Sequence, residues 1–235
     1  MTTRRDEVAG NLRTVHTRIA DACTRAGRDP AEVTLTVVTK FFPASDLRLL
    51  VELGVRHVGE NRHQEAEPKV AECADLDLTW HFVGGLQSNK AAAVAAYADV
   101  VESVDRARLL RGLSRGAVEN GRTLDVLVQV SLDPEPSAAS GRAGADPADV
   151  ERLAEQVLEA EGLRLRGVMA VAPIGVDPEP AFAKLAGIAQ RVRLLDPAAS
   201  WVSAGMSGDF EAAVESGATH VRIGSAVLGS RPLRR

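Results

Sequence analysis

The sequence predicts a single-domain (β/α)8 TIM barrel with an extra helix before the first strand. Three observations support this fold. The chain has 235 residues, a common length for one α/β barrel. Its hydrophobic content of 45% includes only 3% aromatic residues, as is usual in cores built from Ala, Val, Leu and Ile. Short apolar runs alternate with helical patterns eight times, which favours parallel strands joined by right-handed crossovers. We expect one domain over residues 1–235, with an open doubly wound sheet as the main alternative.

The first element is an amphipathic helix. Apolar residues recur at spacings of four and three near the N-terminus, at Val8, Leu12, Val15, Ile19 and Cys23. Gly27 and Pro30 follow them and are typical of a helix end.

Strands and helices then alternate along the chain. The predicted strands lie at 35–40, 56–61, 78–84, 99–104, 124–132, 163–172, 201–205 and 220–224. The helices that follow the first seven strands are expected at about 44–53, 64–73, 90–98, 106–119, 148–160, 180–195 and 210–216. The eighth helix, from about Ala226, would be very short, so we expect the N-terminal helix to cover the gap. Residues 133–149 form one long loop, either a mobile lid or a tolerated insertion.

Composition excludes several classes of function. The formal net charge is −4 and basic residues are scattered among acidic ones, so no nucleic-acid surface is expected. The first residues carry charges where a signal peptide needs an apolar segment, and no apolar run is long enough for a membrane span. We therefore expect a cytoplasmic protein. Cys23 and Cys73 lie far apart, which favours two reduced thiols over a disulfide or a metal site.

Two glycine-containing segments follow the last two predicted strands. "SAGMSGDF" comes after the seventh strand and "RIGSAVLG" after the eighth, which is where barrels often bind phosphate. Their backbone N–H groups, hydroxyls and helix starts suit an anion, so Ser207, Gly224 and Ser225 are phosphate-binding candidates. The alternative is that Ser207 and Asp209 cap a helix while the glycines form turns.

Lys40 lies at the end of the first predicted strand, on the same rim as these segments. An apolar rim lowers the pKa of a lysine and favours the neutral amine that forms a Schiff base with an aldehyde. The alternative is a lysine that reaches out to water. An amine facing a phosphate site suits a ligand with both an aldehyde and a phosphate, and pyridoxal 5′-phosphate is the commonest such cofactor.

Two further residues, Arg222 and Asn61, are candidates for contacts to the ring of this cofactor. Arg222 could donate to the pyridine nitrogen and keep it unprotonated, or it could pair with a carboxylate such as Glu215. Asn61 could bond the phenolic oxygen or cap the following helix. His81 is expected to be a hydrogen-bonded, part-buried histidine.

At these residues the sequence resembles the pyridoxal phosphate homeostasis proteins of the YggS/PROSC type, which are related to the N-terminal domain of alanine racemases. The resemblance covers nearly the whole chain, through "VVTK", "VGEN", "WHFVGGLQSNK", "GVMAVAP" and "SAGMSGDFEAAVESGATHVRIGSAVLG". It implies the fold-type III barrel of pyridoxal phosphate proteins, with the cofactor carried on Lys40.

The resemblance also implies roles for the other candidates. Arg222 would face the pyridine nitrogen, Asn61 and Met206 would line the ring, and the phosphate would be held by Ser207, Gly224 and Ser225. The family is associated with vitamin B6 balance and with no robust turnover. Two departures are Thr39, where serine is often found, and the Ala-rich "SAASGRAG" in the long loop, which leaves the role of a lid open.

A carrier of the cofactor is therefore expected, with an amino-acid racemase-like enzyme as the alternative. A racemase needs two bases on opposite faces of its substrate. The second domain that supplies a tyrosine in alanine racemases has no counterpart after Gly224, and Tyr97 is expected late in a helix, far from any strand's carboxyl end. A Schiff-base aldolase would not explain Arg222. Expected partners are the cofactor and apo-enzymes that accept it, and the chain is expected to be a monomer or a weak dimer.

Overall fold

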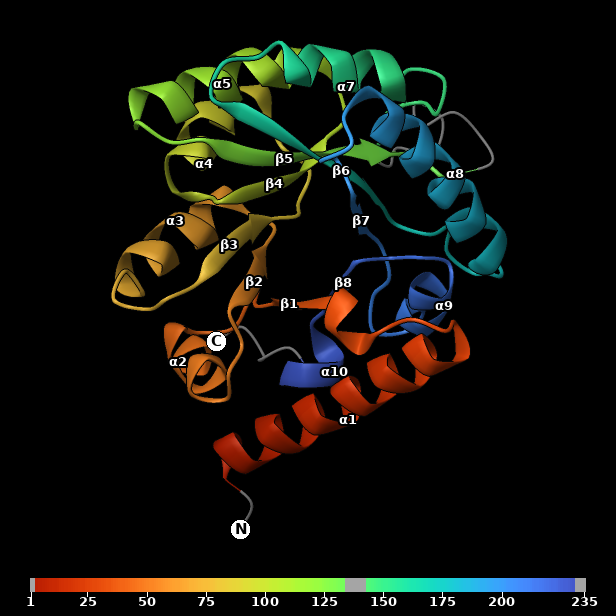
Figure 1. Ribbon diagram of the computed structural model, residues 1–235. Coiled ribbons are helices and arrows are strands. Elements are labelled where there is room, and N and C mark those ends of the chain that lie inside the picture. The colour runs from red at the N-terminus through yellow and green to blue at the C-terminus, as the bar shows by residue number, and fades with distance from the viewer. Residues whose placement is uncertain (1–2, 134–142, 231–235) are drawn as a thin grey trace.

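The computed structural model describes residues 3–133 and 143–230, in which eight parallel strands close into a barrel (Figure 1). The strands are β1 (Thr34–Val38), β2 (His57–Glu60), β3 (Thr79–Phe82), β4 (Val100–Val104), β5 (Leu124–Val130), β6 (Leu163–Ala170), β7 (Trp201–Ser203) and β8 (His220–Ile223). Each strand pairs with the next one, and β8 pairs with β1. This topology confirms the predicted barrel and excludes the open sheet.

Helices surround the barrel in the order that the sequence predicts. They are α2 (Ala44–Glu52), α3 (His63–Glu72), α4 (Ala91–Tyr97), α5 (Leu110–Glu119), α7 (Val150–Leu158), α8 (Glu179–Leu195), α9 (Phe210–Glu215) and the short α10 (Ser225–Leu228). Single 3-10 turns lie at Pro30–Glu32, Ser88–Lys90 and Ala107–Leu109. Within the described ranges, no helix combines the length and the apolar character that a membrane span requires.

The N-terminal helix α1 (Arg4–Arg25) lies across α9 and α10 (Figure 1). It begins with a capping box between Thr3 and Asp6, which satisfies backbone N–H groups of its first turn. Arg4 and Asn11 then donate hydrogen bonds to the backbone carbonyls at the end of α10, each at 2.9 Å. The helix therefore covers the short eighth helix, as predicted.

Most of the predicted strands extend one or two residues beyond the carboxyl ends of the observed strands. The first strand ends at Val38 instead of residue 40, and the seventh ends at Ser203 instead of residue 205. Gly205 has a φ of +87°, a left-handed conformation that ends the extended run. Apolar and glycine residues continue past each strand, but there they line the rim instead of pairing.

The core lies between the barrel and its helices. All seven residues of β5 are buried, which is typical of a strand covered on both faces. Cys23 and Cys73 are buried free thiols, as predicted. Most of the predicted loop at 133–149 lies outside the described residues, but its returning end adds to β5, where Gln129 accepts from the backbone of Ala145 at 2.7 Å.

Candidate functional site

A cavity of about 410 Å3 lies at the carboxyl ends of the strands, lined by residues at or just after the ends of β1, β2, β3, β6, β7 and β8. All seven residues predicted to bind a cofactor line it: Lys40, Asn61, Met206, Ser207, Arg222, Gly224 and Ser225. Phe41 and Phe42, the apolar neighbours of Lys40 in the sequence, also line it, together with Val83, Gly84 and Val171, which the sequence did not single out. Their common signal is their place, just after the end of a strand.

Lys40 lies in a tight turn just after β1 and is half-buried. The Thr39 N–H donates to the Gly59 carbonyl at 2.9 Å, and the Phe42 N–H donates back to the Thr39 carbonyl at 3.0 Å. Between them Phe41 has a φ of +73°, the one positive φ outside glycine among residues 3–133 and 143–230. This conformation costs about 1–2 kcal/mol, and such strain persists where the surroundings fix the backbone. The turn therefore fixes the backbone at Lys40.

A buried ion pair between Glu60 and Lys69 is hydrogen-bonded to this turn. Glu60, the last residue of β2, accepts from the Thr39 hydroxyl at 2.7 Å and from the Lys69 ammonium at 2.6 Å. Lys69 also donates to the Thr39 carbonyl at 3.0 Å. Three elements, β1, β2 and α3, are joined next to Lys40 in this way. The hydroxyl of Thr39 thus has a structural use, whether threonine or serine supplies it.

The two glycine-containing segments meet at their serines. Ser225 donates from its hydroxyl to the Ser207 hydroxyl at 3.2 Å, and the Ala226 N–H donates to the same oxygen at 3.3 Å. The alternative in which Ser207 and Asp209 cap the helix after the seventh strand is wrong, because α9 has no side-chain cap and Asp209 instead accepts from the Met206 N–H at 2.6 Å. Two hydroxyls beside the start of α10 form a site suited to an anion.

Gly224 allows the end of β8 to pass close to β1. A Cβ built on Gly224 would lie 3.1 Å from the Val38 carbonyl oxygen, tighter than an ordinary contact. A Cβ on Gly208, in the other segment, would meet nothing within 4 Å. The first glycine is therefore required by packing, while the second borders the open space of the cavity.

Arg222 lies on the floor of the cavity and is almost fully buried. Its guanidinium donates to the Ser203 hydroxyl at 2.6 Å and to the Ala170 carbonyl at 2.8 Å, and lies 3.6 Å from a Glu102 oxygen. The suggested pairing with Glu215 is wrong, because Glu215 pairs with Arg25 on α1. Burial lowers the pKa of Arg222, and the charge of Glu102 opposes that shift.

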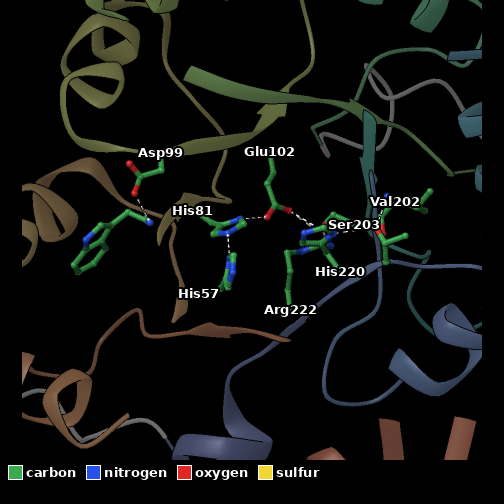
Figure 2. Close-up of polar contacts among 10 residues, drawn as sticks. His57, His81, Asp99, Glu102, Val202, Ser203, His220 and Arg222 are labelled. Carbon is green, nitrogen blue, oxygen red and sulfur yellow. Dashed lines mark hydrogen bonds and ion pairs between the residues drawn. The ribbon is translucent and has the colours of Figure 1, made fainter. Parts of the chain in front are cut away.

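Glu102 and His81 continue this polar network through the barrel interior (Figure 2). Burial alone would raise the pKa of Glu102, but hydrogen bonds from His81 and Ser203, together with the charge of Arg222, lower it to about 2. His81 is fully buried and hydrogen-bonded through both ring nitrogens, to Glu102 at 2.7 Å and to His57 at 3.0 Å. It is therefore the hydrogen-bonded histidine that the sequence predicts.

Asn61 borders the cavity instead of capping a helix. The cap of α3 is Arg62, which makes no side-chain capping bond, so the capping alternative for Asn61 is wrong. The Asn61 side-chain oxygen is buried without a hydrogen-bond partner, which leaves it available to a polar group of a ligand. Met206 adds an apolar wall and is 41% exposed.

Tyr97 corrects one sequence prediction. Its ring stacks on His63, with centroids 5.9 Å apart, and His63 lies only three residues after the end of β2. The tyrosine is therefore close to a strand's carboxyl end, contrary to expectation. It is not among the residues that line the cavity, and burial raises the pKa of its hydroxyl, so Tyr97 stays neutral.

Known proteins resemble this chain along almost its whole length. The family model of the alanine racemase N-terminal domain matches residues 11–232. A pyridoxal phosphate homeostasis protein of Mycobacterium tuberculosis is 43% identical, covering 98% of this chain and 95% of that protein. A protein of the same name from Pseudomonas aeruginosa is 42% identical, covering 95% of this chain and 96% of its own length.

Solved structures give the same result for the fold. PipY of Synechococcus elongatus, solved with PLP bound, has a TM-score of 0.81 and 36% identity, covering 94% of this chain and all of PipY. Alanine racemase of Streptomyces coelicolor has a TM-score of 0.74 at 17% identity, covering 93% of this chain and 58% of the racemase. The racemase shares the barrel alone.

Proposed function

Because this chain belongs to the pyridoxal phosphate homeostasis family, we propose that it binds pyridoxal 5′-phosphate and stores or delivers it without robust catalysis. The observation that carries the proposal is one cavity that combines an amine, a buried guanidinium and a pair of serine hydroxyls. The names of the relatives denote homeostasis of the cofactor, and PipY has been solved with it bound.

The residues present fit this cofactor. The Ser207 and Ser225 hydroxyls at the start of α10 would hold the phosphate, and Arg222 would donate to the ring nitrogen. The buried, unpartnered oxygen of Asn61 would take a hydrogen bond from a ring substituent, and Met206 would cover the ring. When bound, the cofactor would supply an aldehyde, and the Lys40 amine is the residue that would hold it covalently.

The lining of the cavity favours a carrier over a racemase-like enzyme. Among the described residues, Lys40 and Arg222 are the only charged side chains that line it, and no histidine, tyrosine, cysteine or carboxylate does. Arginine stays protonated, so Lys40 is the one general base there. A racemase requires a second base on the opposite face of its substrate.

Replacing Lys40 tests the proposal. Wild-type protein mixed with pyridoxal 5′-phosphate is expected to gain a visible absorbance band, and borohydride reduction should fix the cofactor's mass on the peptide that contains Lys40. Lys40→Ala is expected to lose both signals, while Lys184→Ala, an exposed lysine on α8, keeps them. A wild-type protein that stays colourless would contradict cofactor binding. Rapid racemisation of D- or L-amino acids would contradict the carrier role.

We further propose that residues 1–235 act as one cofactor-binding domain in the cytoplasm, as a monomer or weak dimer, and pass the cofactor to apo-enzymes. Loaded protein should activate an apo-enzyme faster than its cofactor is lost to solution. Equal rates would show simple release instead of delivery. Sedimentation at several protein concentrations measures the oligomeric state.

A further inference from the structure

An acidic residue lies in the middle of a fully buried strand. All five residues of β4 are buried, and Glu102 is 1% exposed. The pairing of β4 with β5 is irregular between Val101 and Val104, the interval that contains Glu102. Such irregularities commonly re-aim a side chain. Here the carboxylate points into the barrel, toward His81 on one side and Ser203 on the other (Figure 2).

Both oxygens of this carboxylate are held. The first accepts from His81 Nδ1 at 2.7 Å, and the second accepts from the Ser203 hydroxyl at 2.6 Å. An ionised carboxylate only accepts, so His81 carries its proton on Nδ1. The other ring nitrogen of His81, Nε2, shares a hydrogen bond with His57 Nδ1, 3.0 Å away. These hydrogen bonds hold Glu102 from the side away from the cavity.

Ser203 connects Glu102 to Arg222. Its hydroxyl accepts from Arg222 Nη1 at 2.6 Å while donating to Glu102. The carboxylate also supplies the counter-charge, 3.6 Å from the same guanidinium nitrogen. The Ala170 carbonyl accepts from Arg222 Nη2 at 2.8 Å, so the planar guanidinium is held at two nitrogens. Arg222 lines the cavity, whereas Glu102 and Ser203 do not.

We propose that Glu102 and Ser203 are positioning residues, which hold the Arg222 guanidinium toward the ring nitrogen of bound pyridoxal 5′-phosphate. This inference rests on the proposed function. A buried guanidinium without its counter-charge is strongly destabilised and turns toward any available water. Glu102 removes that tendency, and the Ser203 hydroxyl sets the angle at which the remaining N–H groups face the cavity.

Discrimination between two ligands tests this role. Equilibrium dialysis compares the affinities for pyridoxal 5′-phosphate and for the analogue in which CH replaces the ring nitrogen. Wild type should prefer the natural cofactor about tenfold or more, because the analogue cannot accept a hydrogen bond from a charged donor. In Glu102→Gln and in Ser203→Ala the preference should fall to within about threefold. If Glu102 and Ser203 had a merely structural role, their replacement would weaken the binding of both ligands equally and leave the ratio of the two affinities unchanged.

Asp125→Asn is the matched control. Asp125 is a nearly buried carboxylate on the neighbouring strand β5, and it pairs with Arg164 instead of Arg222. This variant should keep the wild-type preference. If Glu102→Gln and Ser203→Ala also keep it, the inference is overturned while the proposed function stands. If Glu102→Gln does not fold, Ser203→Ala decides the binding test.

Unfolding of the cofactor-free protein gives a second, independent measurement. In urea, Glu102→Gln and Arg222→Gln should each lower stability, because each leaves one buried charge without its partner. If the two losses were additive, their sum would predict the stability of the double variant. Its unfolding equilibrium constant should instead be at least tenfold smaller than that prediction. Additive losses would overturn the coupling of Glu102 to Arg222. Absence of cofactor binding in wild type would instead refute the proposed function.

Discussion

His220 should make the stability of the protein strongly dependent on pH. It is the first residue of β8, 5% exposed, with its ring 4.2 Å from the Trp201 ring and Nδ1 2.9 Å from the Thr219 hydroxyl. Burial lowers the pKa of His220 to about 3. The positive charge of Arg166 acts in the same direction, and the charge of Glu102 opposes it.

The size of the effect follows from the difference in pKa between the folded and unfolded chains. An unfolded histidine has a pKa of about 6.5, so below that pH the unfolded chain binds a proton that folded His220 does not. The free energy of unfolding therefore falls as the pH falls from about 6.5 toward 3. Between pH 7 and pH 5, this single group accounts for a loss of about 2 kcal/mol.

Neighbouring groups act with the same sign. The pKa of His57 is also lowered, mainly by burial, so His57 adds to the loss over the same range. Glu102 has a depressed folded pKa of about 2, so its contribution is present above its unfolded pKa and is lost only below about pH 4.5. The window from pH 7 to pH 5 therefore isolates the histidines.

Urea unfolding at pH 7 and pH 5 measures this dependence. His220→Asn removes the titrating group. The difference in the free energy of unfolding between pH 7 and pH 5 should therefore be about 2 kcal/mol smaller than in wild type. His16→Asn, which changes an exposed histidine on α1, should behave as wild type. An unchanged pH dependence in His220→Asn would refute the reasoning, whatever the stability of that variant at pH 7.

Two further pairs of variants test the packing at the rim and between strands. Gly167→Ala should lower the free energy of unfolding in urea by about 3 kcal/mol. Gly167 has a φ of +145°, and a Cβ there would lie 1.9 Å from the Trp201 carbonyl oxygen on the next strand. Gly187→Ala, on α8 with nothing within 4 Å, should gain about 0.5–1 kcal/mol, and equal effects would contradict the clash. Lys69→Met should cost about 3 kcal/mol because it leaves the buried Glu60 carboxylate unpaired. The exposed Lys184→Met should change stability by less than about 0.5 kcal/mol, and a similarly small change for Lys69 would exclude a structural ion pair.

The sequence predicts the strands and helices well because each has its own local pattern. The strand ends are less predictable, because Thr39 and Gly205 continue an apolar or small-residue run after the ladder has stopped. A strand ends where its hydrogen bonds to the neighbouring strand end. Apolar residues continue past that point because they line the cavity. The same residues that mislead the assignment of strand ends therefore mark the rim.

The cavity residues are predictable because barrels gather their loops at one end, and Lys40 and Ser207 carry recognisable chemistry. Their supporting residues are not. Glu102 stands out as the one charge in "VVESV", yet nothing local identifies Arg222 as its partner. Sequence proximity favours Glu215 instead, which pairs with α1. Contacts across a closed barrel join strands that are distant in the chain and leave no short-range pattern.

The two sides of the cavity are made at very different times during synthesis of the chain. Lys40 follows the first strand, whereas Ser225 follows the eighth, and β1 pairs with β8 to close the ring. At roughly 5–20 residues per second, a ribosome makes Lys40 on the order of 10 to 40 seconds before Ser225. A growing chain therefore exposes the amine long before the opposing hydroxyls exist. The complete cavity therefore forms only after the eighth strand has left the ribosome.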